Sequence, residues 1–116
     1  ANTAGEHVLA YDIAANGKLG AKREFARLEG FRQTDNGPTS GADGLAVDAE
    51  GRLYVASNAG IQVFTAKGEA LGVIALPKRP QNLAFAGPDK KTLYVVGSGS
   101  AWRFPVLTAG YAGRVK

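Results

Sequence analysis

Short hydrophobic runs separated by glycine-containing turns dominate the middle of the chain. The run Leu45-Ala46-Val47 is followed by the turn Asp48-Ala49-Glu50-Gly51 and by a second run, Leu53-Tyr54-Val55-Ala56. Short apolar runs bounded by turn signals are typical of β-strands, and a glycine at the end of such a turn can adopt positive φ. The pattern therefore predicts a β-hairpin over residues 45–56.

The same pattern occurs again about 40 residues later. Leu45 corresponds to Leu83, 38 residues on, and Tyr54 corresponds to Tyr94, 40 residues on. A repeat of about 40 residues built from short strands is typical of β-propeller blades, which have four strands each. The predicted fold class is therefore all-β, a β-propeller fragment of about two to two and a half four-stranded blades. Because they belong to the repeat, we expect these apolar residues to be buried: Leu45, Val47, Tyr54, Val63, Phe64, Ile74, Phe85, Tyr94 and Trp102.

The repeat divides the chain into three parts. We expect residues 1–41 to be the end of one blade followed by a long polar loop over residues 29–41, residues 42–76 to be a full blade, and residues 77–116 to be the last blade and a tail. Residues 19–28 are rich in helix-forming side chains, but their position in the repeat favours a strand.

The blade count limits what this chain can form alone. A propeller closes with about four to eight blades of about 40 residues each, and 116 residues are too few for that ring. An open arc would leave sheet edges and apolar blade faces uncovered. We therefore expect the chain to be a piece of a longer protein that supplies the missing blades, or to associate with a copy of itself.

Composition excludes several classes of function. The net charge is +4, but the basic residues are scattered over predicted turns without interleaved aromatic residues, so we expect no nucleic-acid partner. No apolar run reaches the length of a membrane-spanning helix, so we expect no membrane partner. Cysteine is absent and His7 is the single histidine, which excludes thiolate sites and histidine-based triads within this chain. No serine lies in a Gly-x-Ser-x-Gly motif.

Several stretches together resemble the SMP-30/gluconolactonase family. They cover most of the chain: Ala42-Asp43-Gly44-Leu45-Ala46-Val47-Asp48-Ala49-Glu50-Gly51, Gly60-Ile61-Gln62-Val63-Phe64, Pro80-Gln81-Asn82-Leu83-Ala84-Phe85, and a tail over residues 107–116 that is similar to the end of bacterial members. The resemblance implies a six-bladed propeller and a metal-dependent hydrolysis of sugar lactones. It leaves the compartment open, with periplasmic or secreted and cytoplasmic locations as alternatives.

The resemblance also implies a site. In this family a divalent metal ion lies in the central tunnel, and the aspartate of the Asp-Gly-Leu motif, here Asp43, is one of its oxygen ligands and takes part in catalysis. The glutamate and asparagine ligands of the family have no match in this chain and would lie upstream, so we expect this chain alone to be inactive. Oxygen ligands favour Ca²⁺, with Zn²⁺ or Mg²⁺ as alternatives. The residue pattern alone permits a simpler interpretation, in which Asp43 belongs to an Asp-Gly turn that opens a strand.

Other polar residues are weaker candidates. Gln81 occupies the place of Asp43 in the next repeat and Asn82 follows it, so both could bind substrate in the tunnel or could cap the strand. Ser57 and Asn58 follow the second strand of the hairpin and could reach a cleft. Asp48 and Glu50 are expected to form a solvated turn. This turn follows the strand 45–47, whereas Asp43 precedes it.

Two functions remain from these observations. The first is a gluconolactonase-like hydrolase, a carboxylic ester hydrolase whose site is completed by blades outside this chain. The alternative is a non-catalytic propeller segment that serves as a protein-binding scaffold, because propellers host many functions. An upstream glutamate and an Asn-Gly-Leu motif would favour catalysis.

Overall fold

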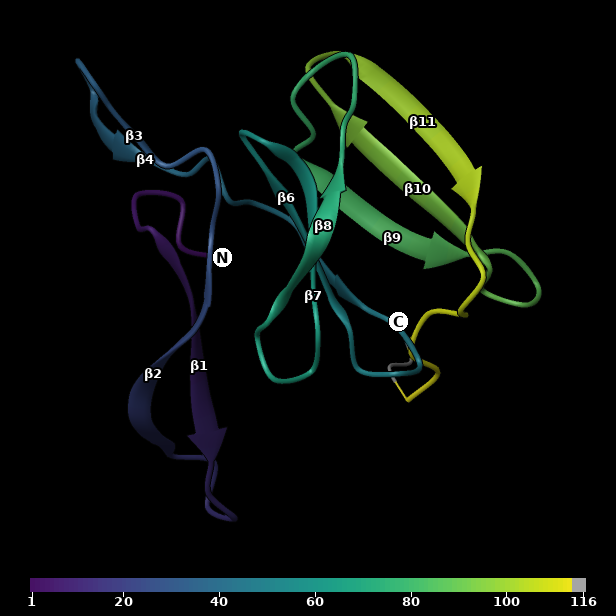
Figure 1. Cartoon of the computed structure of the whole chain (residues 1–116). Helices are drawn as coiled ribbons and strands as arrows, with labels where there is room; N and C mark the ends of the chain where they lie inside the picture. The colour runs from purple at the N-terminus through teal and green to yellow at the C-terminus, as the bar shows by residue number, and fades with distance from the viewer. Residues whose placement is uncertain (114–116) are drawn as a thin grey trace.

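The computed structural model describes residues 1–113 and is built from β-strands joined by turns (Figure 1). No helix occurs among these residues, and none is therefore long and apolar enough to cross a membrane. The predicted all-β fold class is confirmed. Of the predicted tail, residues 114–116 lie outside the described part of the chain.

The central sheet has four antiparallel strands in the order β5-β6-β7-β8. Their bounds are β5 (Leu45–Val47), β6 (Leu53–Ser57), β7 (Gly60–Phe64) and β8 (Ala70–Ile74). Short turns join successive strands, so that each strand pairs with the next one along the chain. The turn between β7 and β8 contains Gly68 at φ 88°, and a Cβ at this position would lie 1.8 Å from the carbonyl oxygen of Phe25. The turn therefore approaches the neighbouring hairpin more closely than any side chain would permit.

A second sheet of three antiparallel strands follows. It contains β9 (Asn82–Ala86), β10 (Thr92–Gly97) and β11 (Ser100–Pro105), with β10 in the middle. The turn between β10 and β11 has Ser98 at φ 50° and Gly99 at φ 71°. Two central residues with positive φ match the twist of a tight two-residue hairpin.

The N-terminal part forms two hairpins. The longer one pairs β1 (His7–Ile13) with β2 (Leu19–Arg27), which confirms a strand where composition alone would have allowed a helix. The shorter one pairs β3 (Arg32–Thr34) with β4 (Gly37–Thr39). The prediction of a polar loop over residues 29–41 is wrong at this point, because the Thr34 hydroxyl donates to the carbonyl of Gly37 at 2.7 Å and closes a tight turn. Pro38 is accommodated because this hairpin has only two strands.

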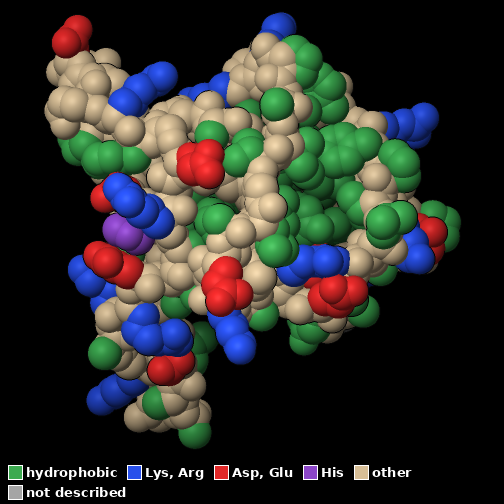
Figure 2. Space-filling model, viewed as in Figure 1, with side chains coloured by type: hydrophobic (Ala, Val, Ile, Leu, Met, Phe, Trp, Pro, Cys, Tyr) green, Lys and Arg blue, Asp and Glu red, His purple; other side chains and the backbone are tan. Residues whose placement is uncertain are grey.

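Two hydrophobic clusters hold these pieces together. The first lies between the β1–β2 hairpin and the central sheet and contains Val8, Ala26, Leu28, Ala42, Val55 and Phe64. The second lies between the two larger sheets and contains Tyr54, Ala56, Ile61, Leu83, Leu93 and Val95. Figure 2 shows the hydrophobic side chains gathered between these sheets. Edge-to-face packing of Tyr54 on Phe85, with ring centroids 5.1 Å apart, adds specificity to the second cluster.

The burial predictions are confirmed for some residues and wrong for others. Tyr54 and Phe64 are buried, and four more predicted residues are half-buried against the second cluster: Val63, Ile74, Phe85 and Trp102. Three predictions are wrong, because Leu45, Val47 and Tyr94 are 36%, 41% and 41% exposed.

Strand alternation explains these three exposures. Leu45 pairs with Val55 and Val47 pairs with Leu53, and residues directly opposite in an antiparallel sheet share a face. That face meets the β1–β2 hairpin, which buries Val55 but does not cover β5. Tyr94 lies on the face of β10 opposite to Leu93 and Val95, and so points away from the second cluster. The sequence identified these residues as apolar strand positions, but no described segment covers these positions of the strands.

Candidate functional site

Asp43 lies at the entrance to β5. Its backbone N–H donates to the carbonyl of Ala56 at 3.0 Å, and the Ala56 N–H donates to the carbonyl of Gly44 at 3.0 Å. These bonds extend the pairing of β5 with β6 to this point and fix the backbone around the carboxylate. The Asp43 residue is exposed, and its side chain makes no hydrogen bond or ion pair with residues 1–113. Its oxygens are therefore available to a ligand.

The start of β9 lies beside the start of β5. The N–H of Gly44 donates to the carbonyl of Gln81 at 2.8 Å, and β5 and β9 are in contact. A Cβ at Gly44 would lie 2.3 Å from Oδ1 of Asn82, so the glycine next to Asp43 lets the two strands meet. The structure thus brings three predicted site residues, Asp43, Gln81 and Asn82, to one end of two neighbouring strands.

The two amides also have structural partners. Oδ1 of Asn82 accepts a hydrogen bond from the N–H of Leu83 at 2.9 Å, and Oε1 of Gln81 accepts one from the N–H of Ser98 at 3.0 Å. These two bonds agree with the simpler interpretation, in which the amide side chains cap backbone N–H groups at the start of the strand. Because an amide oxygen has two lone pairs, each of these oxygens keeps one position for a ligand.

Arg79 and Asn58 lie against Gly41, two residues before Asp43, and sequence reasoning did not select Arg79. Nη2 of Arg79 donates to the carbonyl of Gly41 at 3.2 Å. Gly41 has φ 65°, and a Cβ there would lie 2.1 Å from Oδ1 of Asn58 and 3.1 Å from Nε of Arg79. The glycine at position 41 was the one sign in the sequence that the backbone before Asp43 is closely approached by other side chains. Ser57, in contrast, is buried and donates to the carbonyl of Gly60, so it does not reach a cleft.

The oxygen donors at this end suit a hard cation, but they are few. Asp43 offers an exposed carboxylate, and Asn82 lies beside it with an amide oxygen. Calcium takes about six to eight oxygen ligands. Within residues 1–113 no cluster of three or more His, Cys, Asp or Glu side chains could hold a metal ion. The described residues thus offer the kind of ligand atom that such an ion prefers, but fewer ligand atoms than it requires.

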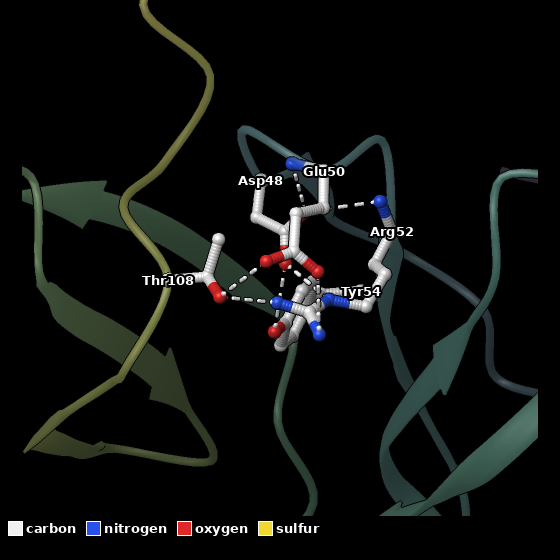
Figure 3. A network of polar contacts seen from close by, with 5 residues as sticks. All are labelled: Asp48, Glu50, Arg52, Tyr54 and Thr108. Carbon is white, nitrogen blue, oxygen red and sulfur yellow. Dashed lines mark hydrogen bonds and ion pairs between the residues drawn. The ribbon is translucent and has the colours of Figure 1, made fainter.

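Asp48 lies at the opposite end of β5 and forms the most connected polar group of the structure (Figure 3). The Asp48 residue is fully buried, which shows that the prediction of a solvated turn is wrong for Asp48, whereas Glu50 is exposed. Its Oδ1 accepts from the N–H groups of Glu50 at 2.9 Å and Arg52 at 3.0 Å, and its Oδ2 accepts from Arg52 Nε at 2.7 Å and from the Tyr54 hydroxyl at 3.2 Å.

These contacts change the acidities of the group. Burial alone would raise the pKa of the Asp48 carboxyl, but hydrogen bonds from the Arg52 side chain and from the backbone of Arg52 and Glu50 outweigh it and lower that pKa. Burial, together with the charge of Asp48, raises the pKa of the Tyr54 phenol. The group is thus an ion pair with an attached neutral phenol, and its place away from Asp43 indicates a structural role.

The C-terminal segment binds to this turn. Nη2 of Arg52 donates to the hydroxyl of Thr108, the N–H of Ala49 donates to the carbonyl of Ala109 at 2.8 Å, and the N–H of Tyr111 donates to the carbonyl of Val47 at 3.0 Å. The same segment bonds to the turn after β9, where the N–H of Gly110 donates to the carbonyl of Lys90 at 2.9 Å. It therefore ties the two larger sheets together at the end opposite Asp43.

A hydrophobic cavity of about 790 Å³ lies along the inner strands β5 and β9. Its walls include Leu45, Val47, Leu83, Phe85 and Tyr111. Asp43, Gln81 and Asn82 do not line it. This cavity is thus separate from the end where the polar candidates meet.

Comparison with known proteins identifies the family. The profile described as the SMP-30/gluconolactonase/LRE-like region matches residues 1–99. The chain is 29% identical over 108 residues to a gluconolactonase from Zymomonas mobilis, covering 92% of this chain and 30% of that protein. It is 36% identical over 99 residues to a 6-deoxy-6-sulfogluconolactonase from Pseudomonas putida, covering 79% of this chain and 31% of that protein.

A solved structure of a gluconolactonase from Xanthomonas campestris superposes on the chain with a TM-score of 0.69 at 27% identity, covering 85% of this chain and 30% of that one. The chain spans about 30% of the length of the Zymomonas mobilis and Pseudomonas putida relatives. The match over residues 1–99 shows that the chain belongs to the SMP-30/gluconolactonase/LRE-like family.

Proposed function

We propose that this chain is part of a lactone hydrolase that uses a divalent metal ion, with Asp43 as a ligand of that ion. The observation that carries the proposal is the exposed carboxylate of Asp43 at the meeting point of β5 and β9. Family membership supports the reaction class, because both relatives named above are lactonases.

The reaction adds water across the acyl C–O bond of a cyclic ester and gives a hydroxy acid. A divalent cation, when bound, would polarise the lactone carbonyl and lower the pKa of a coordinated water. Asp43 would hold the cation and could accept the proton that the attacking water loses. The free lone pairs on the amide oxygens of Gln81 and Asn82 would accept hydrogen bonds from sugar hydroxyls. Ca²⁺ is the proposed ion because the donors are all oxygens, with Zn²⁺ or Mg²⁺ as alternatives.

The remaining ligands would come from outside this chain. The described residues contribute fewer oxygens than Ca²⁺ requires, and the chain spans about 30% of the relatives' length. We propose that the N-terminal remainder of the same propeller, or a self-associated copy, completes the site. The isolated chain is then expected to be inactive.

The test is hydrolysis of a sugar lactone by the longer protein that contains this chain, with and without a chelator. Asp43→Ala should reduce kcat/KM by about 100-fold or more and weaken metal binding in a titration. Asp43→Asn should lose activity but retain part of the metal affinity, because one ligand oxygen remains. The matched control is Asp35→Ala, since Asp35 is also exposed but lies in the β3–β4 turn.

Chelator-sensitive activity at the wild-type level in Asp43→Ala would overturn the assignment. Asp48→Ala is unsuitable as a control, although its place in a turn suggests it. The buried contacts of Asp48 predict a loss of stability that would obscure any effect on activity.

A further inference from the structure

We infer that Arg79 is a specificity residue that binds an anionic substituent of the lactone. The inference rests on the proposed function, because it takes the Asp43 end of β5 and β9 as the substrate site. It adds a substrate class, lactones that carry a phosphate, carboxylate or sulfonate group away from the ester. Nothing in the hydrolysis itself requires this residue.

The position of Arg79 is the first argument. Arg79 lies in the connection from β8 to β9, two residues before Gln81 and three before Asn82. Its guanidinium donates across to the carbonyl of Gly41, two residues before Asp43. The side chain thus bridges the two segments that carry the proposed site residues.

The backbone around Arg79 is held in place. Its carbonyl accepts a hydrogen bond from the Ser98 hydroxyl at 3.0 Å. A Cβ at Gly97 would lie 2.5 Å from the same carbonyl oxygen, so the end of β10 packs directly on this backbone. At the other end of the side chain, Gly41 leaves the space in which Nε lies. The backbone of Arg79 is therefore held by Gly97 and Ser98, while its exposed guanidinium is oriented by a single hydrogen bond to Gly41 and keeps its other N–H groups for a ligand.

The charge of Arg79 is the second argument. Three other arginines, Arg23, Arg27 and Arg52, form ion pairs with Asp12, Glu6 and Asp48. Arg79 forms no ion pair within residues 1–113, and neither do Arg32 and Arg103, but of these three only Arg79 has a guanidinium hydrogen bond, which directs it to the segment that carries Asp43. A guanidinium has five N–H donors, and a planar fork of two of them matches a carboxylate, phosphate or sulfonate. An anion on the substrate would supply the charge partner that the chain does not provide.

The experiment compares a neutral and an anionic lactone with the same longer protein. Glucono-1,5-lactone is the neutral substrate and its 6-phosphate ester is the anionic one. Arg79→Gln should lower kcat/KM for the phosphorylated lactone about three- to tenfold more than for the neutral lactone, with the difference in KM. Arg79→Lys should recover part of the preference, and added salt should reduce it in the wild type. The control is Arg103→Gln, an exposed arginine on β11.

Binding of the open-chain acids separates this inference from the proposed function. Gluconate and 6-phosphogluconate are titrated calorimetrically into wild type, Arg79→Gln and Arg103→Gln. A preference for the phosphorylated acid that only Arg79→Gln loses supports the inference even if neither lactone is hydrolysed. Equal losses for both lactones, or a preference unchanged in Arg79→Gln, would show that Arg79 only fastens the Gly41 loop. Failure of the wild type to hydrolyse either lactone would instead overturn the proposed function.

Discussion

Removing the Asp48 carboxylate should destabilise the fold much more than its place in a β-turn suggests. The carboxylate is fully buried and accepts four hydrogen bonds, two from backbone N–H groups and one each from Arg52 and Tyr54. In Asp48→Ala all four donors lose their acceptor. In Asp48→Asn one oxygen remains, but the new NH₂ group faces the Nε–H of Arg52, which cannot accept a hydrogen bond, and only the Tyr54 hydroxyl is left as an acceptor there.

The structure sets the size of the effect. Removing one partner of a buried ion pair costs about 3–5 kcal/mol, and leaving a buried neutral donor unpaired costs about 1–3 kcal/mol. The Arg52 side chain is 28% exposed and keeps an ion pair with Glu50 at 3.1 Å, so part of its loss is offset by water and by that pair. We therefore expect Asp48→Ala to cost about 2–4 kcal/mol and Asp48→Asn about 1–2 kcal/mol.

Urea denaturation followed by the fluorescence of Trp102, the single tryptophan of the chain, measures this loss. Protein concentration must be the same for all variants, because association would shift the midpoint. Glu50→Gln is the control, since the Glu50 side chain is 63% exposed and its ion pair should contribute less than about 1 kcal/mol. A midpoint for Asp48→Ala equal to that of Glu50→Gln would refute the reasoning.

The same carboxylate gives a pH dependence of known sign. The folded state lowers the pKa of Asp48, so the unfolded chain binds the proton more readily. The contribution of Asp48 is complete above the unfolded pKa of about 3.9 and is lost as pH falls below it, through the lower folded pKa. As pH falls below about 4, the wild type should therefore lose more stability than Asp48→Asn, which has no carboxylate to protonate.

Two further predictions concern packing and association. Gly68→Ala should cost at least about 2 kcal/mol more than Gly17→Ala in urea denaturation, because both glycines have positive φ but only Gly68 lies against a backbone carbonyl, that of Phe25. The isolated 116-residue chain should self-associate, since Leu45, Val47 and Tyr94 are uncovered, and sedimentation at several concentrations would detect it. A cooperative melt of a monomer that is independent of concentration would contradict this second expectation.

The sequence repeat predicted the strands well because it records local alternation. Tyr54 and Phe64 recur in the next repeat as Tyr94 and Phe104, and all four lie in strands of the structure. The repeat could not tell which of them are buried, because burial depends on the sheet packed against each face. Tyr54 meets the second sheet and is buried, whereas the equivalent Tyr94 meets no described segment and is 41% exposed.

The polar sites show the same limit. The repeat predicted that Asp43 and Gln81 occupy equivalent places. The structure adds that the two strand starts are directly connected, by the hydrogen bond from Gly44 to Gln81. The burial of Asp48 depends on Thr108 and the segment after it, more than fifty residues away in sequence. Arg79 was overlooked because its partner is the backbone carbonyl of Gly41, and a backbone acceptor leaves no signature in the side-chain pattern.

The uncovered faces connect the fold to the proposed site. Leu45 and Val47 lie on the part of one face of the central sheet that the β1–β2 hairpin does not cover, and Tyr94 and Val96 lie on the face of β10 opposite to the second cluster; each of the four is at least one-third exposed. Large apolar residues at alternate strand positions, which share a face, are normally covered, so under the proposed function we expect further strands beside β1–β2 and a further sheet against β10 to cover them in the longer protein. We expect each added sheet to pack beside its neighbour in the same way as the β9–β11 sheet packs beside the central sheet. That relation places the start of one inner strand beside the start of the next, as Gly44 lies beside Gln81. Covering the two faces would therefore also bring new strand starts toward Asp43, where they would supply the oxygen ligands that the proposed metal site still lacks.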